Sequence, residues 1–312
     1  MTALGSGLAW LGRHGTWVLF GGVFLGLALP SLAGLARPLL APTVAVLLLT
    51  ALLRLDWRGL AATARRADLT LLLVAWLLVA SPLLLWLPLQ LVALPSGLET
   101  ALVLMAAAPP ILGAVAIALL LGLDGALAVV AGLAATLIAP LVLPPLALGL
   151  LGVELTLGVF DLMLRLGALV AVAFLGAALV RRLATPALLA AKGRELDGAI
   201  VLTMLIFAIA IMDGVTAAAI ADPGKVALWV AAAFLANPAL QLLGALAFGW
   251  LGKRRALTVG LITGNCNMGL LLAALPPGED LDVALYFAVA QLPMYMLPAL
   301  LLPLYRRILA PQ

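Results

Sequence analysis

Long apolar stretches separated by short polar breaks dominate the pattern of the chain. Residues 101–121 and 124–153 contain almost no charged side chains. Each stretch has at least the ~20 residues that a helix needs to cross a ~30 Å hydrocarbon core. The alternation of polar and apolar residues that is typical of membrane-spanning strands does not occur. The pattern therefore predicts an all-α membrane protein.

Apolar length, with breaks at charged clusters and at Pro or Gly, predicts ten transmembrane helices. They cover roughly residues 16–30, 39–53, 69–87, 97–121, 125–149, 156–180, 197–213, 226–250, 255–277 and 282–304. Two of these helices are expected to be broken. The fourth contains Pro109 and Pro110, which remove backbone donors and disturb the residue before them. The ninth contains the polar stretch 264–269.

An internal repeat is visible when the sequence is shifted by 158 positions, which aligns residues 124–145 with 282–303. Asp124 then falls on Asp282, and the proline pair of the fourth span falls on the polar stretch of the ninth. The sequence therefore predicts two five-span repeats, 1–153 and 154–312. An odd number of spans in each makes the second copy inverted, as in many secondary transporters. Chance matching of Leu and Ala is the alternative.

Composition agrees with a membrane protein, because 66% of the residues are hydrophobic against roughly 45–50% in soluble domains. The net charge of +4 would suit a nucleic-acid partner, but the basic residues lie singly or in small groups between apolar segments. We therefore expect a lipid bilayer around the chain and no nucleic acid. One cysteine excludes an intrachain disulfide, and the single histidine, His14, makes a histidine-based metal site implausible.

Basic residues also predict the topology. With a cytoplasmic N-terminus, most of the 17 Lys and Arg residues fall on the inner side: Arg13, Arg54, Arg58, Arg65, Arg66, Arg181, Arg182, Lys192, Arg194, Lys253, Arg254, Arg255, Arg306 and Arg307. The positive-inside rule then predicts a multi-pass inner-membrane protein with both termini in the cytoplasm. The run 16–29, followed by small residues at 31–36, also fits a cleaved signal peptide, but the ten-span count needs this helix.

The two interruptions are the predicted binding site. An interrupted helix in lipid leaves backbone groups unpaired at a cost of several kcal/mol each, so both breaks should face each other in the protein interior. The ends of half-helices there suit anionic groups and small cations. The candidate solute contacts are Thr263, Asn265, Cys266, Asn267, Pro109, Pro110, Asn237 and Gln291.

Each candidate has a structural alternative. Asn265 and Asn267 would satisfy backbone groups freed by the break, Cys266 would fill apolar space, and the prolines would only shape the chain. Asn237, one turn before Gln241, would join two helices by hydrogen bonds.

Asp213, near the predicted outer end of span seven, is a candidate for proton coupling. The alternative is a solvated helix end.

Two segments resemble the bile acid:sodium symporter family and its bacterial homologues. They are "APPILGAVAIALLLGLDGALAVVAGLAATLIAP" at 108–140 and "ANPALQLLGALAFGWLGKRRALTVGLITGNCNMGLLLAAL" at 236–275. The resemblance implies ten helices with a panel domain (spans 1, 2, 6 and 7) and a core domain (spans 3–5 and 8–10), in which broken spans 4 and 9 cross. It also implies sodium-driven import of amphipathic organic anions, such as bile acids, steroid conjugates or small carboxylates.

The chain departs from this family where sodium would bind. The family's sodium-ligand positions fall on Ala114, Val115, Ala128, Gly132, Ile262 and Cys266. Sodium needs several oxygen ligands, which these side chains lack. The sequence therefore argues against sodium coupling in the family's manner, and no other cofactor is expected.

The sequence thus predicts a secondary transporter of an organic, anionic and amphipathic solute that works by alternating access. The alternative is an efflux permease, or an uncoupled or proton-coupled carrier, of the auxin-carrier or arsenite-exporter type, in which Cys266 would supply a reactive thiol. Motifs of intramembrane enzymes, such as His-Glu-x-x-His and Gly-x-Ser-x-Gly, do not occur. Oligomeric state and the direction of transport stay open.

Overall fold

The computed structural model describes residues 10, 15–53, 67–151, 158–184, 188, 191–275 and 281–310. Nearly all of these residues are helical, and no strand occurs among them apart from one isolated bridge. The predicted all-α class is confirmed. Several basic residues used for the predicted topology lie outside the described residues: Arg13, Arg54, Arg58, Arg65 and Arg66. His14, the single histidine, lies outside them too.

Seven helical runs among the described residues are long and apolar enough to cross a membrane, which fits a membrane-embedded protein. They are Pro30–Leu53, Ala67–Leu89, Gly125–Leu151, Val159–Leu183, Glu195–Ala221, Pro223–Ala247 and Leu281–Leu309. The fourth and ninth predicted spans are absent from this set because both are interrupted, and α2 is absent because 14 of its residues are described.

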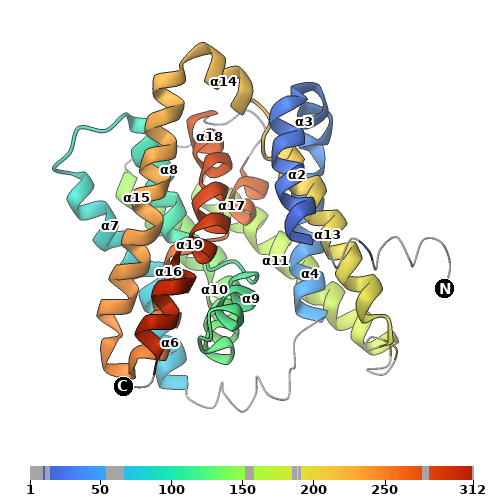
Figure 1. Cartoon of the computed structure of the whole chain (residues 1–312), viewed down its shortest axis with the longest axis vertical. Coiled ribbons are helices and arrows are strands. Elements are labelled where there is room, and N and C mark those ends of the chain that lie inside the picture. The colour runs from blue at the N-terminus through green and yellow to red at the C-terminus, as the bar shows by residue number, and fades with distance from the viewer. Residues whose placement is uncertain are drawn as a thin grey trace. The chain divides into compact units, whose positions relative to one another are not determined.

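The chain divides into two compact units, and the first unit comprises residues 1–55 and 168–226 with a short piece at 272–274. Its helices are α2 (Gly15–Ala28), α3 (Pro30–Ala36), η1 (Arg37–Leu39), α4 (Leu40–Leu53), most of α11 (Val159–Leu183), α13 (Gly193–Ala210) and α14 (Val215–Ala221). In Figure 1, α13 runs beside α2, α3 and α4, and it packs against all three.

The second predicted span starts earlier than expected. It was predicted over 39–53, but helix continues from Pro30 to Leu53, with a 3-10 turn at Arg37–Leu39. Pro30 begins the run because proline, which lacks an N–H, is favoured in the first helical turn. The segment 31–36, which the signal-peptide alternative treats as a cleavage region, is helical in α3.

Span seven also differs from its predicted end at residue 213. Helix α13 ends at Ala210, a turn follows, and α14 resumes at Val215 and reaches Ala221. Gly214 adopts a left-handed backbone (φ 80°), which glycine accepts without strain and which ends the regular helix. Asp213 therefore lies in a turn inside a longer helical run and not at its outer end.

The second unit comprises residues 56–167, 227–271 and 275–312. Its helices are α6 (Ala67–Ala75), the π-helical turn η2 (Trp76–Ala80), α7 (Ser81–Leu89), α8 (Ser96–Ala107), α9 (Ala114–Leu120), α10 (Gly125–Leu151), most of α15 (Pro223–Ala247), η3 (Gly249–Leu251), α16 (Lys253–Gly264), the start of α17 (Met268–Ala274), α18 (Leu281–Val289) and α19 (Gln291–Leu309). Helix α8 is central, because it packs against α7, α10 and α18 and is buried on all sides over residues 100–107.

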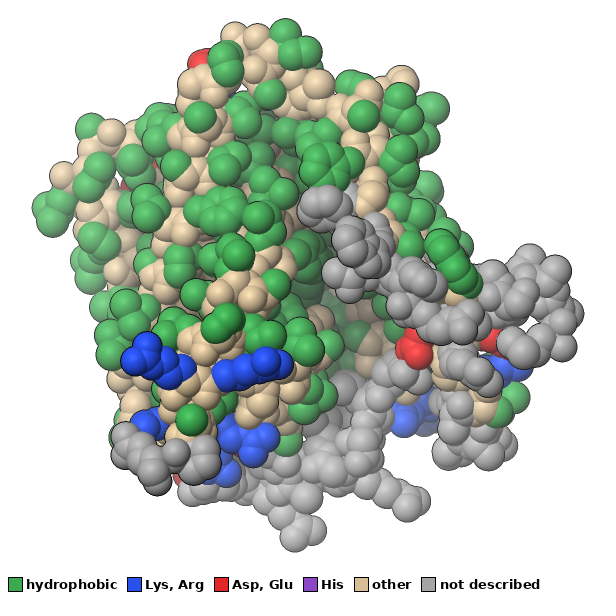
Figure 2. Space-filling model, in the orientation of Figure 1, with side chains coloured by type: hydrophobic (Ala, Val, Ile, Leu, Met, Phe, Trp, Pro, Cys, Tyr) green, Lys and Arg blue, Asp and Glu red, His purple; other side chains and the backbone are tan. Residues whose placement is uncertain are grey.

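The surface of the second unit has the character of a lipid-facing protein. Apolar side chains cover most of the visible face in Figure 2. Along α15, for example, Leu235, Leu242 and Leu246 are each at least 60% exposed. Apolar patches of this extent mark a surface that contacts lipid or another protein.

Candidate functional site

Two helices of the second unit are interrupted where the sequence predicts it. Helix α8 ends at Ala107 and α9 begins at Ala114, while α16 ends at Gly264 and α17 begins at Met268. Ala108 is extended (φ −69°, ψ 142°), as a residue before proline prefers to be. The positions of both predicted breaks are therefore confirmed.

The two interruptions are hydrogen-bonded to each other. The N–H of Asn267 donates to the carbonyl of Pro109 at 2.7 Å, and the N–H of Ile111 donates to the carbonyl of Asn265 at 2.9 Å. Pro110 and Cys266 lie opposite each other between these bonds as an isolated antiparallel bridge. Each break thus satisfies backbone groups that the other leaves free, which removes much of the cost of interrupting a helix in lipid.

Proline suits positions 109 and 110 because the pairing uses no backbone N–H at either position. The two bonds use only the carbonyl of Pro109 and the N–H of Ile111. Neither Pro109 nor Pro110 has an N–H that would be left unpaired, and both residues are buried.

A side chain from α15 satisfies the end of α16. Asn237 Nδ2 donates to the carbonyl of Gly264 at 2.8 Å, and Asn237 Oδ1 accepts from Gln241 Nε2 at 2.7 Å. Gln241 Oε1 in turn accepts from the hydroxyl of Tyr305 at 3.1 Å, and all three side chains are buried. The polar atoms of Asn237 are thus engaged within the protein, in the helix-to-helix bonding that the sequence offers as an alternative to solute contact.

Glycine allows α15 and α16 to approach this closely. A Cβ at Gly264 would lie 2.6 Å from the carbonyl oxygen of Asn237 and 2.5 Å from Gln241 Cγ. On the facing helix, a Cβ at Gly244 would lie 2.5 Å from Thr263 Oγ1. Only glycine permits such contact between backbones.

Asn265 has one satisfied and one unsatisfied end. Its Nδ2 donates to the carbonyl of Leu261 at 2.8 Å, whereas its Oδ1 is buried and has no partner among the described residues. The carbonyl of Leu261 requires a donor at that position, so the amide cannot be turned the other way. The residue is 0% exposed. A buried, unpaired acceptor costs about 1–3 kcal/mol, so this oxygen is a candidate for contact with a hydrogen-bond donor.

Gln291, the first residue of α19, shows the same pattern. Its Nε2 donates to the carbonyl of Phe287 at 3.0 Å, and its buried Oε1 has no partner in the described part of the chain. No hydrogen bond joins Gln291 to either interruption within that part. The structure therefore does not connect it to the other candidates.

Asn267 caps the second half-helix. Its Oδ1 accepts from the N–H of Leu270 at 3.1 Å, which is a conventional N-cap at the start of α17. The side chain is half-buried, and its Nδ2 makes no hydrogen bond with the described residues. One donor therefore stays free beside the paired backbones.

The hydroxyl and thiol of this stretch are used locally. Thr263 Oγ1 donates to the carbonyl of Val259 at 2.7 Å and accepts from Trp76 Nε1 at 3.0 Å. Cys266 Sγ donates to the carbonyl of Thr263 at 3.2 Å and is buried. The cysteine is thus held within the break and is not exposed as a surface thiol.

Trp76 and Tyr305 are site residues that sequence analysis missed, because both lie in apolar runs. The available signal was that a buried Trp or Tyr usually finds a hydrogen-bond partner. Trp76 also begins a π-helical turn, and such turns are frequent at functional sites.

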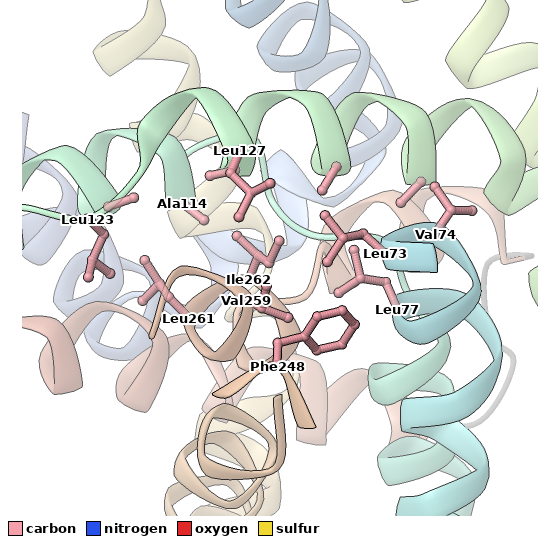
Figure 3. Close-up of a cluster of buried hydrophobic side chains, with 14 of the residues drawn as sticks. Leu73, Val74, Leu77, Ala114, Leu123, Leu127, Phe248, Val259, Leu261 and Ile262 are labelled. Carbon is pink, nitrogen blue, oxygen red and sulfur yellow. The ribbon is translucent and has the colours of Figure 1, made fainter. Parts of the chain in front are cut away.

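The positions of the symporter family's sodium ligands are apolar in this structure. Ala114, Ala128 and Ile262 belong to one buried hydrophobic cluster, and Val115 packs against it. Figure 3 shows Ala114 and Ile262 in this cluster with Leu127 and Phe248. A Cβ at Gly132 would be 3.6 Å from Leu112 Cδ2. These residues offer no side-chain oxygen, so they do not fit a sodium ion.

Asp213 belongs to the first unit and is paired. Its Oδ2 accepts from Arg37 Nη1 at 3.1 Å, with the two side chains 31% and 28% exposed. The carboxylate thus lies in the turn that follows the end of α13 and has a basic partner on η1. The long-range pair explains how both charges occur inside helical runs.

No protein-family model matches the chain, and no curated protein is significantly similar to it. The resemblance to bile acid:sodium symporters therefore rests on the two sequence segments alone.

Proposed function

We propose that the protein is a secondary transporter that carries an organic, amphipathic solute across a membrane by alternating access. The supporting observation is the pair of helix interruptions that bond to each other through their backbones. Irregular backbone at membrane depth is tolerated only inside protein or beside a watery cavity, and discontinuous helices form the substrate sites of many transporters.

The proposed architecture is ten spans in two inverted repeats, with a panel and a core domain. The division of the chain supports it, since the first unit holds predicted spans 1, 2, 7 and most of 6, and the second holds spans 3–5 and 8–10. The interruptions support the repeat, because 108–113 shifted by 158 residues overlaps the break after Gly264.

The proposed membrane is the inner membrane, with both termini cytoplasmic. Supporting this orientation, basic residues occupy the first turn of α16 and the last turn of α19, whose predicted side is cytoplasmic.

The free atoms at the site define the solute chemistry that we propose. Asn265 Oδ1 accepts a hydrogen bond from a hydroxyl of the solute, and Asn267 Nδ2 donates to a carboxylate or other anionic oxygen. A hydroxylated organic acid, such as a bile-acid-like or smaller carboxylate, offers both groups. Apolar side chains around the breaks contact the remainder of the molecule.

Coupling to sodium through side chains is not part of this proposal, because the matching positions are packed apolar residues. Coupling to protons through Asp213 is not part of it either, because Arg37 already engages that carboxylate.

A stability screen of the purified full chain tests the proposal. Hydroxylated organic acids and steroids are added in sodium buffer and in choline buffer, and the unfolding temperature is measured. The proposal predicts ligands that stabilise the wild type equally in both buffers and stabilise Asn265→Leu much less. Thr136→Val is the control, because the Thr136 hydroxyl donates only to its own helix, at the carbonyl of Gly132.

Two results would contradict the proposal. In one, no organic acid or steroid stabilises the protein. In the other, Asn265→Leu responds to the same ligands as strongly as the wild type, which would remove the site from the second interruption.

A further inference from the structure

Five basic side chains gather at one end of the second unit. They come from the first turn of α16 and the last turn of α19, two helices that pack against each other: Lys253, Arg254, Arg255, Arg306 and Arg307. We call this set the basic cluster. Figure 2 shows Lys and Arg side chains concentrated at this end, below a surface that is mostly apolar.

Among the described residues, protein groups account for two members of the basic cluster. Arg254 donates to the carbonyl of Leu123 at 3.1 Å, and Arg255 pairs with Asp124 at 3.3 Å. Lys253, Arg306 and Arg307 are exposed and have no acceptor among the described residues. The cluster therefore keeps a net positive charge.

Helix stability does not explain the position of these charges. Lys253, Arg254 and Arg255 stand at the N-terminus of α16, where the helix dipole favours negative charge, and no acidic residue occurs in that turn. Neighbouring like charges also repel each other. An external anion would relieve both unfavourable terms.

The surroundings of the cluster indicate that this anion lies at a membrane surface. Trp250 is 68% exposed and stacks on Phe248, with ring centroids 6.2 Å apart and planes at 28°. Trp is enriched where a membrane meets water. On α19, the exposed Leu300 and Leu304 precede the two arginines. Apolar surface, an aromatic side chain and basic charge thus follow each other along this end of the unit.

We infer that the basic cluster binds the headgroup phosphates of anionic phospholipids, whose chains cover the adjacent apolar surface. The order of apolar and basic groups matches the order of acyl chain and phosphate in a phospholipid. A basic side chain near an anionic membrane surface contributes about fivefold to affinity. Losing two of them therefore predicts a decrease of more than tenfold in selectivity for anionic lipid.

Lipid retention by the full chain tests this inference. The protein is reconstituted in vesicles of phosphatidylcholine and phosphatidylglycerol, re-purified in detergent, and the bound lipids are quantified. The wild type should retain phosphatidylglycerol in excess of its share in the vesicles. Arg306→Gln/Arg307→Gln should lose most of this excess, and adding Lys253→Gln should remove the rest.

The matched control is Arg165→Gln/Lys225→Gln, which removes two positive charges that lie on separate helices. This control should retain the excess. High salt should weaken retention by the wild type, because exposed charges are screened. Helical content from circular dichroism checks that each variant is folded.

Three outcomes would overturn the inference. In the first, the cluster variants retain as much phosphatidylglycerol as the wild type. In the second, the control variant loses as much phosphatidylglycerol as the cluster variants do. In the third, inorganic phosphate alone raises the unfolding temperature of the wild type as much as phosphatidylglycerol does. That result would mean that the cluster binds phosphate and not lipid.

Discussion

The two interruptions meet through the same backbone bonds but are built from opposite kinds of residue. The first is formed by Pro109 and Pro110, which have no backbone donor and bring no polar side chain. The second is formed by Asn265 and Asn267. The Asn267 amide caps one half-helix, and the Asn265 amide has an acceptor without a partner among the described residues. One break is therefore shaped by removing backbone donors, and the other by adding polar side chains.

The second interruption is also packed more tightly than the first. The second is supported by a buried side-chain network from α15 and by close contact at Gly264. Beside the first, Gly132 has only ordinary contacts with Leu112 and Pro110. Substitutions at the second break should therefore cost more stability and also affect ligand binding.

The largest expected effect comes from adding one methyl group at Gly264. Gly264→Ala would place a Cβ 2.6 Å from the backbone oxygen of Asn237, which cannot move without shifting α15. We expect a loss of roughly 3 kcal/mol, at the upper end for overpacking. Thermal or denaturant unfolding measures it.

Gly132→Ala, on α10 beside the first interruption, is the matched change. Its added Cβ would meet Leu112 at 3.6 Å, an ordinary contact, and alanine favours helix by about 0.5–1 kcal/mol over glycine. Stability should therefore be unchanged or slightly higher. Equal losses in the free energy of unfolding for Gly264→Ala and Gly132→Ala would contradict the difference in packing between the two interruptions.

Asn237→Ala should have the next largest effect. It leaves the carbonyl of Gly264 and the amide of Gln241 without their buried partners. We expect a loss of about 2 kcal/mol in the free energy of unfolding, because buried polar groups left unpaired cost about 1–3 kcal/mol. Thr136→Val, which removes a hydroxyl bonded only to its own helix, should cost much less. A neutral Asn237→Ala would mean that water replaces the amide.

Asn267→Ala should cost about 1 kcal/mol, the usual value for losing an N-cap. Asn267→Ser should recover most of this stability, because serine also caps helices. If Asn267 also donates to the solute, as proposed, ligand-induced stabilisation should stay low in the serine variant. Full recovery of both properties would assign Asn267 a capping role alone.

Cys266→Ser should have the smallest effect on stability, about 0.5 kcal/mol or less, because a hydroxyl can donate to the carbonyl of Thr263 as the thiol does. The same variant tests the arsenite-exporter alternative. Arsenite should not stabilise the wild type under the organic-solute proposal. Stabilisation by arsenite that disappears in Cys266→Ser would favour the alternative.

Much of this fold could be predicted because apolar length and proline act locally. The long apolar runs gave the helical class, and Pro109, Pro110 and the polar stretch 264–269 gave the positions of both breaks. Apolar length did not predict that the helical run of the second span includes Arg37, or that the run of the seventh span continues past Asp213. A single charge looks like a helix end until its partner, 176 residues away, is known.

For the candidate site, the sequence predicted which polar residues take part but not their hydrogen-bond partners. Polar side chains in an apolar run identified Asn265 and Cys266, but their partners depend on the tertiary structure. Asn237 reaches the end of another helix, and Trp76 and Tyr305 look like apolar core residues in the sequence. The orphaned oxygen of Asn265 can be recognised only once every neighbouring donor is placed.

Disulfide trapping tests the pairing of the two interruptions most directly. Pro110 and Cys266 are opposite residues of an antiparallel bridge, between the two backbone bonds. Such pairs have Cα atoms about 4.5 Å apart, which suits a disulfide. Cys266 is the single native cysteine, so Pro110→Cys creates one defined pair.

Mild oxidation of the reconstituted protein, followed by alkylation and intact-mass measurement, gives the answer. We predict that Pro110→Cys forms an intramolecular disulfide and loses both reactive thiols, whereas Leu112→Cys, two residues further along the same break, keeps both. Free thiols in oxidised Pro110→Cys, or equal cross-linking of the two variants, would contradict the paired interruptions on which the proposed transport site depends.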